Sequence, residues 1–207
     1  MLTAPLIGIN RHRIETDGRG ITTLVAFYGC PLRCKYCLNP KCFSTDGAYN
    51  TVSTAELISV LEKDELYYLA TGGGVTFGGG EPLLYTDFII ELLESGAKRW
   101  NITIESSLNV PQAKLEALLS YIDEYIIDIK DTDADLYKLY TGTNNTLVLN
   151  NLQWLIRQGK ASSIHCRLPL IPGINTYSHI EKSKYLLSNI GITRFDEFEY
   201  ITNQTDK

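Results

Sequence analysis

Six short apolar segments rich in β-branched residues recur along the chain, and amphipathic helical patterns separate them. The segments are Ile21–Tyr28, Gly74–Phe77, Asn101–Glu105, Tyr125–Lys130, Ser162–Leu168 and Phe195–Tyr200. Their length and composition are typical of buried strands. Strands that alternate with helices predict βαβ units, in which parallel strands form a sheet covered by helices.

The intervening segments carry helix-boundary signals. The signals for a helix start are the pair Ser53 and Glu56, Thr86, Pro111, and the pair Ser178 and Glu181. The signals for a helix end are Gly96, after the helix that Thr86 begins, and Gly159, after the apolar helix face of Leu152, Leu155 and Ile156. A Ser with Glu three residues later is a capping-box pattern, and glycine commonly follows a helix. We therefore expect a helix after each of the first five strands.

This pattern fits a doubly wound sheet and a partial barrel equally well. In both architectures functional residues gather at the carboxyl ends of the parallel strands. No stretch between the strands has linker-like composition, so we expect one domain over residues 1–207.

Composition and charge narrow the function classes. The net charge is −5 without a basic run, which disfavours a nucleic-acid partner. Met1–Asn10 does not resemble a signal peptide, and no apolar run is long enough to span a bilayer, so we expect a cytoplasmic protein with no membrane partner. Five cysteines in a reducing compartment indicate metal binding or catalysis rather than disulfides.

Three of the cysteines, Cys30, Cys34 and Cys37, form a C-x3-C-x2-C motif after the first predicted strand. A structural zinc site usually needs two pairs of ligands, whereas Cys42 has no partner nearby and Cys166 lies far along the chain. Three thiolates on one loop suit a [4Fe–4S] cluster with one iron open to a substrate or cofactor. A plain electron-transfer cluster would normally show a fourth cysteine ligand.

The segment "GVTFGGGEP", Gly74–Pro82, places glycines at the end of the second predicted strand. Glycines let the backbone approach a ligand closely and leave its carbonyls able to accept hydrogen bonds. Taken alone, the segment is equally typical of a strand followed by a tight turn.

Two further strands end in charged residues. Alternation places Asp128 and Lys130 of "IIDIKD" on one face, with Ile127 and Ile129 on the other, although a solvated edge would also explain the charges. In "CRLPLIPGIN", Arg167 shares a face with His165, which is as readily a core residue as a site residue. Cys166 on the opposite face is most simply a small buried hydrophobe.

The segment "CPLRCKYC", with Tyr36 before the third cysteine, resembles the radical S-adenosylmethionine (SAM) superfamily. The resemblance implies that Cys30, Cys34 and Cys37 hold a [4Fe–4S] cluster whose open iron binds SAM. It also implies that reduction of SAM yields a 5′-deoxyadenosyl radical, which abstracts a hydrogen atom. Tyr36 would then flank the adenine, and the turn formed by Gly79, Gly80 and Glu81 would receive the methionyl ammonium.

The order of further blocks is most similar to the activating enzymes of glycyl radical enzymes, the family of the pyruvate formate-lyase activase. The similar blocks, between about Asp17 and Asn175, include "DGRGITTLVAFYGCPLRCKYCLNP", "ESSLNVP" and "YTGTNNTLVLNNLQWL". This resemblance implies a partial (β/α)6 barrel with parallel strands and outer helices. It assigns Lys130 and Arg167 to the SAM carboxylate, and Asp128 with Glu105 to a monovalent cation.

The same resemblance implies a glycyl radical enzyme as protein substrate, flavodoxin or ferredoxin as electron donor, and a monomeric activase. The sequence departs from the family at Arg19 and Thr22, which stand where relatives often have proline and arginine. A histidine expected near the sixth strand is absent, and Tyr200 or Asn203 is nearest to its place.

Two alternatives to an activase stay open at this point. One is a radical SAM enzyme that acts on a small molecule or a peptide. The other is a non-catalytic module that binds an iron–sulfur cluster or another metal.

Overall fold

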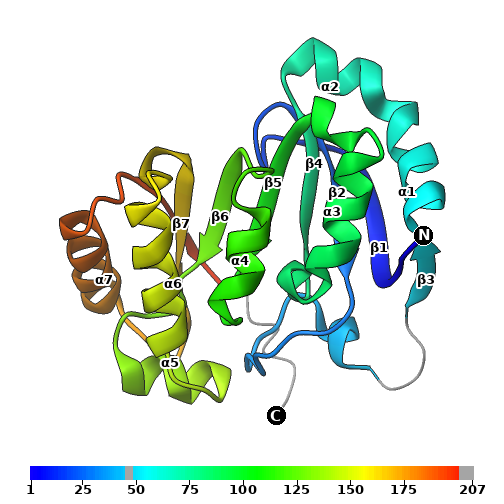
Figure 1. Cartoon of the computed structure of the whole chain (residues 1–207). Coiled ribbons are helices and arrows are strands. Elements are labelled where there is room, and N and C mark those ends of the chain that lie inside the picture. The colour runs from blue at the N-terminus through cyan, green and yellow to red at the C-terminus, as the bar shows by residue number, and fades with distance from the viewer. Residues whose placement is uncertain (45–48, 201–207) are drawn as a thin grey trace. The chain divides into compact units, whose positions relative to one another are not determined.

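The computed structural model describes residues 1–44 and 49–200 (Figure 1). These residues group into two compact units. The first unit contains Met1–Pro31, Asn39–Ser106 and Val110–Ile126, and the second contains Leu32–Leu38, Ser107–Asn109 and the chain from Ile127 onward. Asn203, one of the two residues nearest the missing histidine, lies outside the described residues. The single domain expected over residues 1–207 stays a prediction.

The first unit is built on a sheet with the strand order β3-β1-β2-β4-β5. Its strands are β1 (Thr3–Ile14), β2 (Ile21–Phe27), β3 (Asn50–Ser53), β4 (Gly74–Gly79) and β5 (Asn101–Ser106). Strands β2, β4 and β5 are parallel, whereas β1 runs antiparallel to both β2 and β3. The carboxyl ends of the three parallel strands therefore lie along one edge of the sheet.

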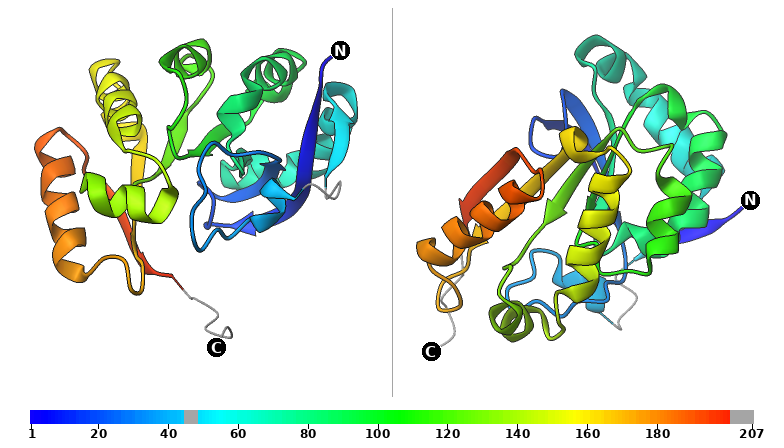
Figure 2. Two further views of the ribbon diagram at one scale, coloured as in Figure 1. Left: turned by 90° about the horizontal axis from the view of Figure 1, so that it is seen from below. Right: turned by 60° about the vertical axis from the view of Figure 1, so that its left-hand side comes forward.

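Helices cover this sheet and complete its core. They are α1 (Thr54–Leu61), α2 (Glu65–Thr71), α3 (Thr86–Glu94) and α4 (Gln112–Leu118), with short 3-10 helices η1 (Pro40–Phe43), η2 (Glu62–Asp64), η3 (Pro82–Tyr85) and η4 (Ala97–Arg99). In Figure 2, α3 and α4 lie on the same side of the sheet. Phe77 and Ile104 from the strands and Ile89 from α3 are fully buried, as expected for strands enclosed by βαβ crossovers.

The second unit contains the remaining helices and the pair of parallel strands β7 and β8. Its elements are α5 (Ala134–Thr141), α6 (Thr146–Arg157), η5 (Ala161–Ser163), β7 (Ile164–Leu170), α7 (Tyr177–Asn189) and β8 (Arg194–Glu199). Strand β6 (Glu124–Asp128) crosses the division between the units after Ile126. Helices α6 and α7 both lie on the same face of the β7–β8 pair (Figure 2).

The six strands expected from the sequence are confirmed as β2, β4, β5, β6, β7 and β8. Strands β1 and β3 were not predicted. Pro5 and Gly8 interrupt the pattern of β1, and register shifts break its pairing with β2 on either side of Gly8–Asn10. Because pairing with the neighbouring strands stabilises β1, its own sequence shows only a weak pattern of strand residues.

The predicted helix boundaries are confirmed at some ends and wrong at others. Ser53 and Glu56 form the expected capping box of α1, with the Ser53 N–H donating to the Glu56 carboxylate at 2.8 Å. The last helix begins earlier than the pair Ser178 and Glu181 predicted, because Thr176 caps α7 and the His179 ring occupies the reciprocal position. Thr86 is the first residue of α3 rather than its cap, and its hydroxyl donates to the Leu83 carbonyl at 2.9 Å.

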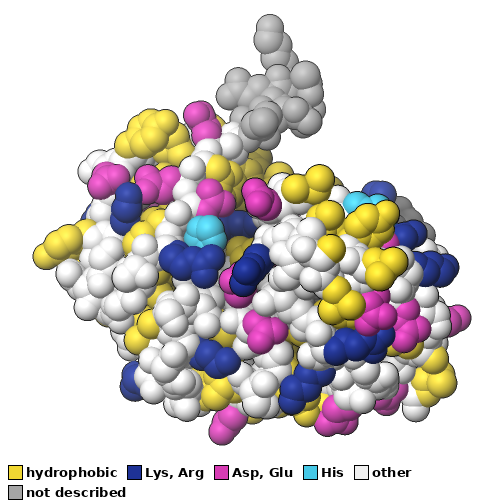
Figure 3. Space-filling view, turned by 90° about the horizontal axis from the view of Figure 1, so that it is seen from above, with side chains coloured by type: hydrophobic (Ala, Val, Ile, Leu, Met, Phe, Trp, Pro, Cys, Tyr) yellow, Lys and Arg dark blue, Asp and Glu magenta, His cyan; other side chains and the backbone are white. Residues whose placement is uncertain are grey.

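The described part of the chain contains no helix with the length and apolar character needed to cross a membrane. On the face shown in Figure 3, lysine and arginine side chains are interspersed with aspartate and glutamate. Among the residues that the structure describes, this face therefore has no continuous basic patch, in agreement with the absence of a basic run in the sequence.

Candidate functional site

The three cysteines of the motif follow β2 and fall on both sides of the division between the units. Cys30 belongs to the first unit, and Cys34 and Cys37 belong to the second unit through its segment Leu32–Leu38. All three are partly exposed, whereas Cys42 and Cys166 are buried, and none of the five is in a disulfide. The burial of Cys166 confirms its interpretation as a small core residue.

Helix α5, which the sequence patterns did not predict, positions the segment around Cys34. The Arg33 N–H donates to the Thr141 carbonyl at 2.9 Å, and the Lys35 N–H donates to the Tyr140 carbonyl at 3.0 Å. Carbonyls in the last turn of a helix lack partners within the helix, so they are available to the cysteine segment. These two bonds bracket Cys34 and fix its backbone against the end of α5.

The Cys34 side chain packs against an apolar cluster within the second unit. The buried members of the cluster are Tyr140, Ile171 and Tyr200, and Ile174 and Phe198 pack against them as well. Burial raises the pKa of the Cys34 thiol to about 11, and the nearby positive charge of Lys130 partly opposes that rise. Cys34 is thus partly desolvated and lies near the ammonium group of Lys130.

The turn after β4 carries Gly79, Gly80 and Glu81 and is tied to the end of β2. The Gly80 N–H donates to the Phe27 carbonyl at 2.9 Å, and the Glu81 N–H donates to the Gly29 carbonyl at 2.8 Å. Gly79 has φ +93°, a conformation that favours glycine. Gly29 immediately precedes Cys30, so this turn also supports the start of the cysteine motif.

Glu81 contributes to this turn through a fully buried carboxylate. Its Oε1 accepts a hydrogen bond from Ser106 Oγ at 2.8 Å, at the end of β5, and a longer one from the Leu83 N–H at 3.3 Å. The carboxylate therefore braces the turn from inside the first unit. We infer that a ligand would meet the backbone of the turn rather than the Glu81 side chain.

Replacing Gly80 with alanine is expected to distort this turn. A Cβ at Gly80 would lie 2.1 Å from the Gly29 carbonyl oxygen, so the backbone would have to move. We expect a loss of about 3 kcal/mol in the free energy of unfolding and impaired iron binding, because Cys30 would move with Gly29. Thermal unfolding and iron content after reconstitution measure the two effects.

The matched control is Gly8→Ala, because a Cβ at Gly8 would have no heavy atom within 4 Å. It is expected to change the free energy of unfolding by less than about 0.5 kcal/mol. A Gly80→Ala protein as stable as Gly8→Ala, with full iron content, would contradict the assigned role of the turn.

Glu105 and Asp128, the pair expected to bind a monovalent cation, belong to different units. Glu105 is half-buried on β5, and a Cβ at Gly78 would lie 3.2 Å from its Oε2. Asp128 is half-buried at the end of β6. Their joint role therefore stays a prediction.

Lys130, which the sequence predicted as a site residue, is buried in the second unit. Its Nζ donates to Asp128 Oδ2 at 3.0 Å and to the Tyr200 hydroxyl at 3.2 Å. Burial opposes the charged form, but the Asp128 carboxylate, with further contributions from Tyr200 and Cys34, holds the pKa of Lys130 well above its ordinary value. Lys130 therefore carries a positive charge suited to an anionic ligand. Ile127 and Ile129 are buried, but Lys130 is buried as well and β6 ends at Asp128, so the alternation of faces stays a prediction.

Arg167 lies on β7, and its backbone is hydrogen-bonded to the segment that contains Lys130. The Ile129 N–H donates to the Arg167 carbonyl at 3.0 Å, and Arg167 Nε lies 3.6 Å from Asp196 Oδ2 on β8. His165 is half-buried on the same strand. Arg167 is thus close in the sheet to the Asp128–Lys130 segment, and its predicted contact with a carboxylate stays a prediction.

Tyr36 keeps an accessible ring within the cysteine segment. Its side chain is 40% exposed, and its backbone carbonyl accepts a hydrogen bond from the Tyr140 hydroxyl at 3.4 Å. The two rings lie 6.3 Å apart between centroids. An exposed aromatic face in a fixed segment can stack on a planar base, which is the role expected for Tyr36.

The structure also identifies residues that local patterns missed. Tyr140 supports the Cys34 segment, Ser106 holds the Glu81 carboxylate, and Asn39 Nδ2 donates to the Gly79 carbonyl at 2.9 Å. The block "YTGTNNTLVLNNLQWL" begins with Tyr140 and resembles the family, but the sequence alone gives no physical reason for a tyrosine at this position. These contacts join residues that are distant in sequence, so periodicity and spacing do not reveal them.

No group of three or more His, Cys, Asp or Glu side chains lies close enough together to hold a metal ion within residues 1–44 and 49–200. The ligand assignment of Cys30, Cys34 and Cys37 therefore stays a prediction. The chemistry of the donor set suits iron, because all three thiols are accessible on one short segment and outside disulfides.

Comparison of the sequence with known proteins identifies the family to which the chain belongs. Residues 24–183 match the Radical SAM superfamily. The (2S)-3-sulfopropanediol dehydratase activating enzyme of Klebsiella oxytoca is 30% identical over 231 residues, covering 82% of this chain and 72% of that protein. The pyruvate formate-lyase-activating enzyme of Clostridium pasteurianum is 38% identical over 135 residues, covering 63% of this chain and 56% of that protein.

A solved structure supports the fold. SuiB of Streptococcus suis, crystallised with S-adenosylmethionine, matches with a TM-score of 0.63 at 19% sequence identity. The match covers 86% of this chain and 38% of SuiB. It confirms the predicted fold class, a mixed α/β fold of the partial-barrel type with mostly parallel strands.

Proposed function

We propose, on the premise that the chain belongs to the glycyl-radical-enzyme activating enzymes of the radical SAM superfamily, that it cleaves SAM reductively and takes a hydrogen atom from a glycine of a partner enzyme. Membership in that family makes the protein an oxidoreductase-type enzyme. One observation carries the finer proposal. Cys34, a predicted iron ligand, and Lys130, a predicted carboxylate-binding group, both contact Tyr200 in the second unit, Cys34 through the apolar cluster and Lys130 through the Tyr200 hydroxyl.

Cys30, Cys34 and Cys37 would hold a [4Fe–4S] cluster and leave one iron for SAM. The partly exposed thiols fit this role, and the end of α5 fixes the backbone on both sides of Cys34. When bound, the cluster and SAM supply the electron and the 5′-deoxyadenosyl radical. The task of the protein is to bind and orient them.

The remaining predicted residues would orient SAM through their charge and shape. Lys130 and Arg167 would bind the methionyl carboxylate, because a buried ammonium and a guanidinium suit an anion. The backbone of the Gly79–Glu81 turn would accept hydrogen bonds from the methionyl ammonium, and the exposed Tyr36 ring would flank the adenine. Asp128 and Glu105 supply the carboxylates for a monovalent cation.

The protein substrate proposed here is a glycyl radical enzyme, and the electron donor is a flavodoxin or a ferredoxin. The names of the relatives, which are activating enzymes, support the first of these assignments. The proposal keeps the monomeric state and the cytoplasmic location expected from the sequence.

The test is an anaerobic assay of the full chain after reconstitution with iron and sulfide. Reductant and SAM are added, and 5′-deoxyadenosine is quantified with and without purified glycyl radical enzymes. We expect SAM cleavage together with a glycyl radical signal in electron paramagnetic resonance on one partner. The signal should be lost when the accepting glycine of that partner is replaced by alanine.

The same assay separates the alternatives. Cleavage of SAM without a glycyl radical on any partner would favour an enzyme that acts on a small molecule or a peptide. A protein that binds iron but never cleaves SAM would favour the non-catalytic module and would refute the proposed reaction.

A further inference from the structure

Tyr200 follows β8 and is buried within the second unit, with 6% of its surface exposed. Its N–H donates to the Leu170 carbonyl at 2.9 Å, which fixes the backbone beside β7. Its ring lies 6.1 Å from the Tyr140 ring and 5.5 Å from the Phe198 ring between centroids. The ring therefore belongs to the apolar cluster that also contacts Cys34.

The hydroxyl of Tyr200 has a partner outside the apolar cluster. It accepts a hydrogen bond from Lys130 Nζ at 3.2 Å, and Nζ lies 5.6 Å from the centre of the Tyr200 ring. The packing of the ring does not require this hydroxyl, because phenylalanine would fill the same space. The hydroxyl contributes the contact with Lys130 and also a side-chain hydrogen bond with Tyr140.

We propose that Tyr200 is a positioning residue that orients the Lys130 ammonium toward the carboxylate of SAM. This inference rests on the proposed function. An ammonium has three N–H donors in a tetrahedral arrangement. Asp128 and Tyr200 each accept from one of them, so their two directions fix the direction of the third.

A single anchor would leave the position of the ammonium poorly defined. Lysine is a point charge on a flexible stem, so its geometry depends on the groups that hold it. With Asp128 alone, Nζ would be free to move around the carboxylate and settle more deeply into the ion pair. The Tyr200 hydroxyl draws Nζ away from Asp128 and keeps one N–H directed to a ligand.

The arrangement also links two functional groups through the second unit. Tyr200 holds Lys130 through its hydroxyl and packs through its ring against Tyr140. Tyr140 in turn accepts the Lys35 N–H beside Cys34. A residue at the end of β8 thus contacts both the proposed carboxylate-binding lysine and the residue that supports the Cys34 segment.

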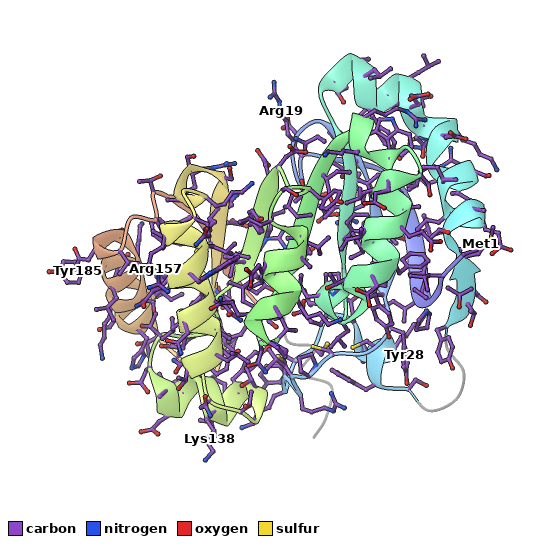
Figure 4. The ribbon with its side chains drawn as sticks, viewed as in Figure 1. Met1, Arg19, Tyr28, Lys138, Arg157 and Tyr185 are labelled. Carbon is purple, nitrogen blue, oxygen red and sulfur yellow. The ribbon has the colours of Figure 1, made fainter. Side chains whose placement is uncertain are left out.

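The experiment compares two ligands that differ in one group. The dissociation constants of SAM and of decarboxylated SAM are measured by calorimetry on the reconstituted full chain, for the wild type, Tyr200→Phe and Tyr185→Phe. Tyr185 is the control because it is 67% exposed and projects outward from α7 (Figure 4). Decarboxylated SAM lacks the carboxylate that Lys130 would bind. A loss of affinity for it therefore measures any general damage to the binding site, apart from the contact between Lys130 and the carboxylate.

Tyr200→Phe is expected to weaken SAM binding about tenfold, because a poorly directed Lys130 would lose much of its charge-assisted hydrogen bond with the SAM carboxylate. Its affinity for decarboxylated SAM should change less than about twofold, and Tyr185→Phe should match the wild type with both ligands. The ratio of the two affinities does not depend on the fraction of folded protein, so it stays informative if the variant is destabilised.

Equal weakening of both ligands, or no weakening of either, would overturn the positioning role and leave the proposed function intact. A wild-type protein that bound neither ligand would refute the proposed function and this inference together. The two failures are therefore distinguishable.

Discussion

Cys34→Ala is expected to abolish assembly of a four-iron cluster and to reduce SAM cleavage at least about 100-fold. Loss of a residue that only hydrogen-bonds to a metal ligand costs up to about 100-fold, and loss of the ligand itself should cost more. The remaining thiols, Cys30 and Cys37, cannot complete a three-cysteine ligand set. Iron and sulfide analysis, the absorbance of the reconstituted protein and the yield of 5′-deoxyadenosine measure the result.

The controls use the two cysteines outside the motif. Cys42 and Cys166 are buried at 2% and 0% exposure, so replacing either with alanine is expected to cost roughly 1 kcal/mol of stability while iron content stays at the wild-type level. A Cys34→Ala protein that still bound four irons and cleaved SAM would refute the ligand assignment. Loss of the cluster in Cys42→Ala would show that this cysteine, too, takes part.

Lys130→Met is expected to weaken SAM binding about 100-fold, because the SAM carboxylate would lose its charged, hydrogen-bonding partner in a desolvated site. Methionine keeps much of the apolar stem and removes the ammonium that Asp128 and Tyr200 hold. Because the pKa of Lys130 is raised, its charge is present at every pH below the ordinary lysine value and is lost only as the pH rises through the raised pKa. SAM affinity in the wild type should therefore be constant from about pH 7 to 9 with respect to this group.

Lys138→Met is the matched control, because Lys138 is exposed and projects from α5 away from the unit (Figure 4). It should bind SAM as the wild type does. Binding by Lys130→Met within about threefold of the wild type would exclude Lys130 from the carboxylate site and with it the role of Tyr200.

Most of the parallel strands were predictable because their signal is local. Val25 in β2, Phe77 in β4 and Ile104 in β5 lie in short β-branched and aromatic runs that end at glycine or polar residues. The antiparallel β1 was not predictable in this way. Its sequence contains Pro5, Gly8 and a run of polar residues, and its extended conformation depends on pairing with β2 and β3.

The sequence by itself determined the chemistry-bearing residues, because motif spacing fixes which thiols, glycines and charges follow each strand. The tertiary structure decided how the buried polar groups are satisfied. In the fold the Glu81 carboxylate accepts a hydrogen bond from Ser106, and the last carbonyls of α5 accept from the residues on either side of Cys34. The Tyr200 hydroxyl accepts from Lys130, 70 positions away in the sequence. Each buried donor or acceptor needs a partner, and the fold determines which distant residue supplies it.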